Sequence, residues 1–219
     1  MTAWRDIWPL HDLLLTTPRL RLRPVRDEDL PGLVAASLAG IHDPHRMPFA
    51  VPWTREEPRT IALNTALNVW RHRTEVSPDE WSVSFAVLLD ARVVGRQDVR
   101  ARHFLDLKTV ETGSWLTKAQ QGKGLGKEMR AAVLLWSFDH LGAECAETAA
   151  FDGNAASQGV TESLGYRRNG ERLKRIAPGE TAVSHEYRLR REEFKRPEWV
   201  LQVEGHDEVA RLFGIGQPR

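Results

Sequence analysis

The chain has 219 residues, in which 31 Lys and Arg nearly balance 30 Asp and Glu to give a formal net charge of +1. A hydrophobic fraction of 41% and a charged fraction of 28% are ordinary for a globular protein and argue against a disordered chain. The single cysteine, Cys145, excludes an intrachain disulfide and a cysteine-based metal cluster.

The N-terminal segment carries early charges and a proline and lacks the apolar core of a secretion signal. No apolar run approaches the ~18 residues that a membrane span needs. We therefore expect a cytoplasmic protein with no membrane partner. The near-neutral charge balance also gives little support for a nucleic-acid partner, although a local basic patch stays open.

Residues 1–16 are interpreted as an arm. Apolar and cationic residues then alternate from Leu20 to Arg26 at the period of a half-buried strand. The arginines of this strand form one face, which we interpret as solvated, with a phosphate or nucleic-acid site as the alternative. A helix is expected from residues 27–29 through Ala39, because acidic residues favour the positive end of a helix. The proline-rich stretch that follows is typical of a lid, and we name residues 40–55 the lid loop.

The rest of the chain alternates between helical and extended patterns. The predicted elements are a helix over about 56–73, a hairpin of strands 82–89 and 92–100, a strand over 109–117, a helix to about 140, a strand over 145–150, a helix over 155–164, and strands from 165 and over 181–189. Residues 190–219 are expected to form a helical turn and an extension. This order predicts a mixed α/β domain.

A glycine-rich loop lies between a predicted strand and a predicted helix. It reads Gln121, Gly122, Lys123, Gly124, Leu125, Gly126 and Lys127. Glycines at such a junction let backbone N–H groups converge on an anion, and the helix dipole adds about half a positive charge there. A pyrophosphate is the natural occupant, with two lysines beside it.

Two common nucleotide-binding patterns do not fit this loop. The Walker A pattern requires Ser or Thr after Gly-Lys, but Glu128 follows Lys127, and Gln121 stands where its first glycine belongs. The dinucleotide-binding pattern requires a third glycine at the position of Lys127. A turn that binds no ligand remains as the alternative.

The pattern that does fit is Gln-x-x-Gly-x-Gly, and here the chain resembles the GNAT superfamily of N-acyltransferases. Three further segments are similar to its RimJ/RimL-like branch and occur in the same order. They are Thr17-Pro-Arg-Leu-Arg-Leu-Arg23, Glu111-Thr-Gly-Ser-Trp-Leu-Thr117, and Asn154-Ala-Ala-Ser157 followed by Leu164-Gly-Tyr166.

The resemblance implies a mostly antiparallel central sheet with splayed fourth and fifth strands and flanking helices. It covers a domain over residues 17–190, and leaves the lid loop and the extension over 191–219 outside the common core. These two segments are similar to those of actinobacterial members, some of which use succinyl-coenzyme A. Acetyl- or succinyl-coenzyme A is therefore the implied co-substrate, with no metal.

The resemblance also assigns roles to residues. The loop over 121–127 would bind the pyrophosphate of coenzyme A, and Trp115, Leu116 and Thr117 would bind its pantetheine arm, with an N–H near Leu116 polarising the thioester carbonyl. Asn154 would bind the same arm or cap the following helix. Ser157 would protonate the leaving thiolate or serve only as a serine of the first helical turn.

The resemblance also implies a general base. Glu111 matches a carboxylate that acts through water in several members, and a solvated strand-edge glutamate is the alternative. The branch often has Gly-Phe-x-x-Glu-Gly after its last helix, whereas this chain has Asn169 in place of the glutamate. This departure leaves the acceptor amine open and keeps a non-catalytic acyl-coenzyme A-binding module as the alternative function.

In the lid loop, His42 and Arg46 are candidate substrate contacts, because an enclosed succinyl carboxylate needs a partner. Trp53 is a third candidate, because it could line the methylenes of that group. His42 and His45 with Asp43 also suggest a metal site, but we favour a substrate-covering loop. The reaction expected is acyl transfer from acyl-coenzyme A to a primary amine in a ternary complex. The expected acceptor is a small-molecule amine or a protein N-terminus, and a homo-oligomer stays open.

Overall fold

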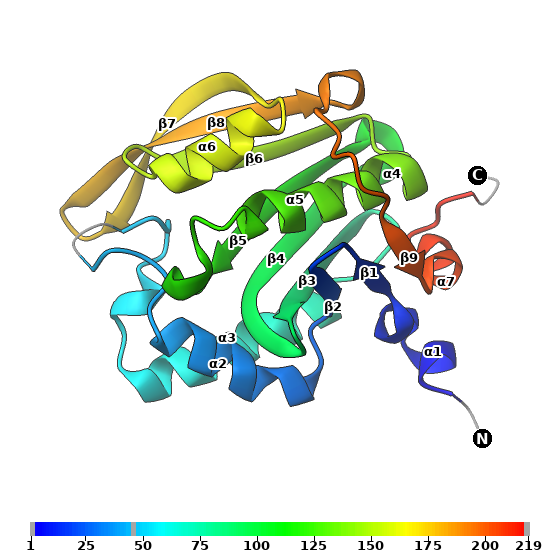
Figure 1. The fold of residues 1–219 in the computed structure, drawn as a ribbon, viewed down its shortest axis with the longest axis horizontal. Helices are drawn as coiled ribbons and strands as arrows, with labels where there is room; N and C mark the ends of the chain where they lie inside the picture. Colours follow the sequence, from blue (N-terminus) through cyan, green and yellow to red (C-terminus); the bar gives the residue numbers. More distant parts are fainter. Residues whose placement is uncertain (1–2, 45–46, 217–219) are drawn as a thin grey trace.

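The computed structural model describes residues 3–44 and 47–216. Its described residues form a nine-stranded sheet of order β7-β8-β6-β5-β4-β3-β2-β1-β9 (Figure 1). The strands are β1 (Leu14–Thr16), β2 (Leu20–Pro24), β3 (Glu80–Leu89), β4 (Arg92–Arg102), β5 (Thr109–Leu116), β6 (Cys145–Phe151), β7 (Arg167–Ala177), β8 (Glu180–Arg190) and β9 (Gln202–Glu204). Neighbouring strands are antiparallel except β5 and β6, which are parallel. The expected mixed, mostly antiparallel fold is confirmed.

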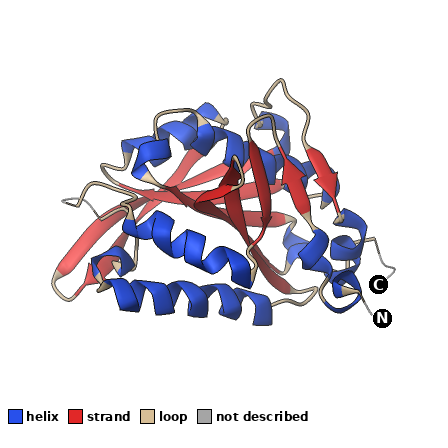
Figure 2. Cartoon of the chain, turned by 60° about the horizontal axis from the view of Figure 1, so that its bottom comes forward, coloured by secondary structure: helices blue, strands red, loops and turns tan. Residues whose placement is uncertain are grey.

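Helices cover both faces of the sheet (Figure 2). They are α1 (Trp4–Ile7), α2 (Leu30–Leu38), α3 (Pro58–Thr74), α4 (Phe104–Leu107), α5 (Leu125–Leu135), α6 (Ala155–Ser163) and α7 (His206–Leu212). One core lies under α5 and contains Val87, Val94 and Leu116, and a smaller core under α2 and α3 contains Ala86. Successive strand residues therefore face different helices, as the two-residue period of a strand requires.

The hairpin of β3 and β4 turns at Asp90 and Ala91, where the sequence predicts a tight turn. Both residues have positive φ, 49° and 62°. Two consecutive residues of this kind match the right-handed twist of the flanking strands. The hairpin places β4 beside β5, so it supports the strand that leads into the glycine-rich loop.

The arm and the extension contribute to the sheet. Residues 14–16 of the arm pair with β2 on one side and with β9 of the extension on the other. The ring of Phe213, which follows α7, stacks on Trp81 with centroids 4.3 Å apart, and both side chains are fully buried. Segments at the two ends of the chain therefore complete one edge of the molecule.

The parallel strands β5 and β6 diverge. They pair only from Thr109 to Glu111 on β5 and from Cys145 to Glu147 on β6. At the next step the hydroxyl of Thr148 donates to the carbonyl of Thr112 at 2.9 Å, so a side chain replaces the ladder hydrogen bond. We call residues 112–116 of β5 and 148–151 of β6 the wedge.

Candidate acyl-coenzyme A site

The glycine-rich loop, residues 121–126, runs directly into α5. Gly122 and Gly124 have φ of 74° and 78°, a backbone region that residues with a side chain rarely adopt. Gly124 is the N-cap of α5, and the N–H groups of the first helical turn have no partner within the helix. Lys123 and Lys127 are exposed beside them. The arrangement presents N–H donors and two cations to an anion.

A buried carboxylate anchors this loop to the start of the domain. Glu128 is 7% exposed and accepts hydrogen bonds from the Thr17 hydroxyl at 2.6 Å and from the Arg19 N–H at 3.0 Å. The Arg19 guanidinium binds the other Glu128 oxygen at 2.6 Å and the carbonyl of Lys123 at 3.0 Å. The sequence showed Thr17 and Arg19 as part of a motif, but it did not reveal that they hold the loop.

The Gln121 side chain ties the loop to two other segments. Its amide donates to the carbonyls of Leu116 on β5, at 2.9 Å, and Ile41 in the lid loop, at 2.7 Å. The N–H of Lys118 also donates to the carbonyl of Gly40 at 2.9 Å. The end of β5, the glycine-rich loop and the start of the lid loop are thus fixed relative to one another.

The end of β5 presents different groups to three sides. Leu116 packs into the main core, and the ring of Trp115 on the opposite face lies 6.1 Å from Trp53 of the lid loop. The carbonyl of Thr112 accepts from the Thr148 hydroxyl across the wedge, and the carbonyl of Leu116 accepts from the Gln121 amide of the glycine-rich loop. Because N–H and C=O of one residue point the same way in a strand, the N–H groups of Ser114 and Leu116 also face the wedge. The N–H of Thr117 instead pairs with the carbonyl of Val94 on β4.

Helix α6 borders the wedge. Asn154 is its N-cap, and the side-chain oxygen accepts from the N–H of Ser157 at 3.2 Å. The capping alternative considered for Asn154 is therefore observed. A methyl group built on Gly126 of α5 would lie 3.5 Å from Val160 of α6, so the two helices meet closely beside the loop.

Glu111 is the last residue of β5 that pairs with β6, and it lies on the face covered by α2 and α3. Its carboxylate is half exposed and pairs with Arg100 of β4. A second carboxylate on this face, Asp98, lies opposite Gly113 and is bound by Arg96, while its Oδ1 is buried without a hydrogen-bond partner. The sequence did not single out Asp98, because an acidic residue in a strand gives no sign of what it faces.

The lid loop packs over the end of β5. Both ring nitrogens of His42 lie 2.7 Å from loop atoms, the carbonyl of Asp43 and the hydroxyl of Thr54. The ring of Trp53 lies tilted against that of Phe49, with centroids 5.5 Å apart. Arg55 forms two hydrogen bonds with Glu180 at the tip of the hairpin of β7 and β8, at 2.7 and 3.1 Å. His45 and Arg46 lie outside the described residues.

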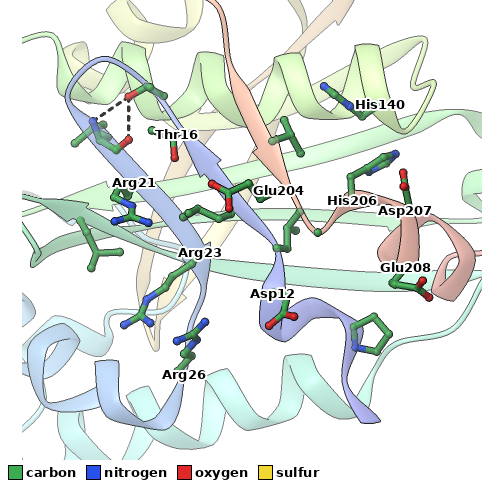
Figure 3. Close-up of a pocket in the computed structure, with 18 of the residues that line it drawn as sticks. Asp12, Thr16, Arg21, Arg23, Arg26, His140, Glu204, His206, Asp207 and Glu208 are labelled. Atoms are coloured by element: carbon green, nitrogen blue, oxygen red, sulfur yellow. Dashed lines mark hydrogen bonds between the residues drawn. The ribbon is translucent and has the colours of Figure 1, made fainter. Parts of the chain in front are cut away.

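A wide hollow of about 1470 Å³ lies elsewhere, between the arm, β2 and the C-terminal segment. Figure 3 shows Arg21, Arg23 and Arg26 on the β2 side, with Asp12 on the arm and Glu204 on the C-terminal segment. Its described lining residues include none from the glycine-rich loop or the wedge. Arg23 is bound by the buried Asp29 at 2.7 Å, and Arg21 is exposed. The interpretation of this strand face as solvated therefore holds for Arg21 and is wrong for Arg23.

The described residues also bear on metal binding, on the reactivity of the cysteine and on membrane insertion. No group of three or more His, Cys, Asp or Glu side chains there is arranged to hold a metal ion. Burial raises the pKa of the Cys145 thiol, which favours the unreactive protonated form. None of the described helices is long and apolar enough to cross a bilayer.

Comparisons with known proteins agree with this geometry. Residues 19–167 match the family described as acetyltransferase (GNAT) domain. Similar solved structures include Mycobacterium smegmatis RimJ in complex with a coenzyme A disulfide, with 19% identity over 93% of this chain and 95% of that one and a TM-score of 0.70. RimL, a ribosomal alpha-N-protein acetyltransferase with coenzyme A, has 15% identity over 80% of this chain and 95% of that one and a TM-score of 0.64.

A GCN5-related N-acetyltransferase from Brucella melitensis has 20% identity over 82% of this chain and 79% of that one, with a TM-score of 0.64. At these identities the solved structures support the fold, whereas the family match spans most of the chain. The chain belongs to the GNAT acetyltransferases and is an acyl-coenzyme A-dependent N-acyltransferase.

Proposed function

We propose that the glycine-rich loop and the wedge together bind acyl-coenzyme A and that a primary amine attacks the thioester directly. The observation that carries this proposal is the continuity between the two parts. Strand β5 remains paired with β4 but separates from β6 after Glu111, and it runs into a loop whose N–H groups and lysines suit a pyrophosphate. The N–H groups of Ser114 and Leu116, which face the wedge, would bind the pantetheine arm and polarise the thioester carbonyl.

In this proposal the remaining assigned residues keep distinct roles. Asn154 contributes its side-chain N–H groups to the pantetheine arm while its oxygen caps α6. Glu111 accepts the proton of the attacking amine through water, and the hydroxyl of Ser157 protonates the departing thiolate. The C–N bond forms as the C–S bond breaks, and the electron pair of that bond stays on sulfur.

The proposed acceptor is an α-amino group or a small amine of low pKa. An α-amino group has a pKa near 8, so roughly one in ten molecules is neutral at pH 7, whereas a lysine, with a pKa of about 10.4, is neutral in fewer than one in a thousand. The carboxylate of Glu111 is already paired with Arg100, so an acceptor that is more often neutral in solution needs less help from this base. A protein N-terminus or a small-molecule amine is therefore favoured.

The contacts of the lid loop favour one acyl group over the other. We propose acetyl as the principal acyl group, with succinyl as the alternative. A succinyl carboxylate would need a donor when enclosed, and both nitrogens of His42 already have partners in the loop. Trp53 against Trp115 gives an apolar wall, which suits a short acyl chain better than an anion.

The release of free thiol from acetyl-coenzyme A tests the reaction. In the presence of a library of peptides and small amines, an active transferase releases coenzyme A at a rate that depends on the amine. A non-catalytic binding module, the alternative function, binds acetyl-coenzyme A in calorimetry and releases no thiol above the background with any amine.

Thermal unfolding with each donor tests the acyl group. A ligand at a hundredfold excess over its dissociation constant stabilises by about 2.7 kcal/mol, and each kcal/mol raises Tm by roughly 2–4 °C in a protein of this size. We expect acetyl-coenzyme A to give a shift at least as large as succinyl-coenzyme A at equal concentration. A larger shift with succinyl-coenzyme A, lost in Arg46→Ala, would establish succinyl as the preferred group.

A further inference from the structure

Helix α5 carries a buried arginine that the roles assigned above leave unused. The Arg130 side chain is 4% exposed. Its Nη1 donates to the hydroxyl of Thr161 at 2.9 Å, its Nη2 donates to the hydroxyl of Ser114 at 3.0 Å, and its Nε is buried without a partner. It forms no ion pair with any residue in the described ranges 3–44 and 47–216.

Such a cation costs stability. Burial lowers the pKa of Arg130, yet a guanidinium keeps its proton at physiological pH. Neutral hydroxyls compensate a buried charge less well than a carboxylate does. Met129 and Val133 of α5 are buried and apolar, and the buried Glu128 of the same helix is paired with Arg19. Packing alone therefore does not require an arginine at this position.

Arg130 lies between β5 and α6, next to the wedge. Its two hydroxyl partners lie on opposite sides, Ser114 on β5 and Thr161 on α6. The N–H of Ser114 faces the wedge, and Thr161 lies one helical turn after Ser157, whose carbonyl it binds at 2.8 Å. The guanidinium therefore bridges β5 and α6 beside the wedge, near the end at which β5 and β6 are still paired.

The groups around this position are hydroxyls. The Tyr166 hydroxyl lies 3.4 Å from that of Thr112, and burial raises the pKa of Tyr166, which keeps it neutral. The charged side chains of the neighbouring elements have other partners or face away. They are Glu111 with Arg100 on the far face of β5, Glu147 with Arg188 on β6, Glu128 with Arg19 on α5, and the exposed Glu162 on α6.

We propose that Arg130 is a positioning residue for the leaving group: it orients the hydroxyls of Ser114 and Thr161 and places a positive charge beside the sulfur of coenzyme A. The inference rests on the proposed placement of the thioester in the wedge. When the C–S bond breaks, its electron pair remains on sulfur as a thiolate, and the amine proton goes to the general base. Arg130 keeps all its protons and stabilises the thiolate electrostatically.

The pKa of the coenzyme A thiol in the binary complex is the direct readout, measured from the ultraviolet absorbance of the thiolate during a pH titration. Free coenzyme A, titrated in the same buffer, gives the reference pKa of the thiol. The wild-type protein should lower that value for bound coenzyme A by about one unit or more, a tenfold change in the thiolate equilibrium. Arg130→Met should abolish the shift, and Arg130→Lys, which keeps the charge, should retain part of it.

Two further measurements separate this role from a structural one. In Arg130→Met, kcat with acetyl-coenzyme A should fall by about 10²-fold while its KM stays within about threefold. Without ligand, the Tm of Arg130→Met should equal or exceed that of the wild type, because an apolar side chain replaces an uncompensated buried charge. Arg23→Met, which removes the ion-pair partner of the buried Asp29, is the matched control and should lower Tm without affecting the thiol.

Thr161→Val provides a second variant that keeps the charge and removes one oriented hydroxyl, and it should lose part of the thiol shift. If the wild-type protein binds coenzyme A and the pKa of the bound thiol equals that of free coenzyme A, the inference is overturned and the proposed function stays intact. A wild-type protein that binds no coenzyme A would overturn both. A thiol pKa equal in the wild type and in Arg130→Met would assign the shift to other groups.

Discussion

At the residue scale, the face of β5 under α2 and α3 carries the proposed base. Glu111→Gln should lower kcat by about 10²-fold, because the amide cannot accept the amine proton, and should leave the affinity for the donor nearly unchanged. Steady-state kinetics at pH 7 check both values. Glu147→Gln is the control, because Glu147 pairs with Glu111 in register and has its own arginine, Arg188.

Wild-type turnover in Glu111→Gln would remove this residue from the mechanism. Asp98→Asn would then be the next variant, because Asp98 lies on the same face, opposite Gly113, with one carboxylate oxygen unpartnered. A loss of turnover in Asp98→Asn alone would assign the role of general base to Asp98 on β4.

The contact of Arg19 with Glu128 makes a second prediction. Arg19→Ala removes hydrogen bonds to a buried carboxylate and to the carbonyl of Lys123, so it should cost about 1–3 kcal/mol of stability. It should also weaken the binding of coenzyme A, because the glycine-rich loop loses a fixed point. Chemical unfolding and calorimetry measure the two effects.

Arg102→Ala is the control for this substitution, because its ion pair with Glu80 is exposed and distant from the loop. We expect little change in either measurement. An unchanged affinity for coenzyme A in Arg19→Ala would show that the loop holds its shape without this contact.

At the element scale, the close approach of β4 to β5 fixes the strand that leads to the loop. A Cβ on Gly95 would lie 2.3 Å from the carbonyl oxygen of Trp115, whereas a Cβ on Gly113 would meet nothing within 4 Å. Gly95→Ala should therefore displace the end of β5, cost about 1–3 kcal/mol and weaken coenzyme A binding. Gly113→Ala should leave stability unchanged, and equal effects of the two substitutions would contradict this packing.

The elements themselves were largely predictable. The helix expected over 56–73 occurs at Pro58–Thr74, and the strand expected over 145–150 occurs at Cys145–Phe151. The hydrophobic period and the glycine and proline residues that end elements are local signals, so they locate helices and strands of this length. The three-residue strands β1 and β9 were not predicted, because three residues carry no period and their pairing depends on each other.

The site was predictable only where it is contiguous in sequence. The glycine-rich loop and the Asn154 cap are local motifs, and the structure places both beside the wedge. The contacts of Arg19 with Glu128 and of Arg55 with Glu180 join residues 109 and 125 positions apart, which one sequence does not reveal. Arg130 gave one signal, a cation beside the apolar residues Met129, Ala132 and Val133, and only the structure shows that none of the described residues is its counter-ion.

At the scale of the whole molecule, the extension after Arg190 is packed into the core. Phe213→Ala should cost about 3–5 kcal/mol, because its ring is fully buried against Trp81. Val200→Ala, in the same extension but 84% exposed, should have little effect. Chemical unfolding checks both, and a small loss in Phe213→Ala would make the extension an appendage to the domain.

The central claim is that one continuous site, from the glycine-rich loop through the wedge, holds acyl-coenzyme A. A crystal structure with acetyl-coenzyme A bound tests it most directly. The pyrophosphate should lie on the N–H groups between Gly122 and Lys127, with the carbonyl oxygen of the thioester on the N–H of Ser114 or Leu116 and the sulfur beside Arg130. Coenzyme A bound instead in the hollow lined by Arg21 and Glu204, with the wedge empty, would contradict it.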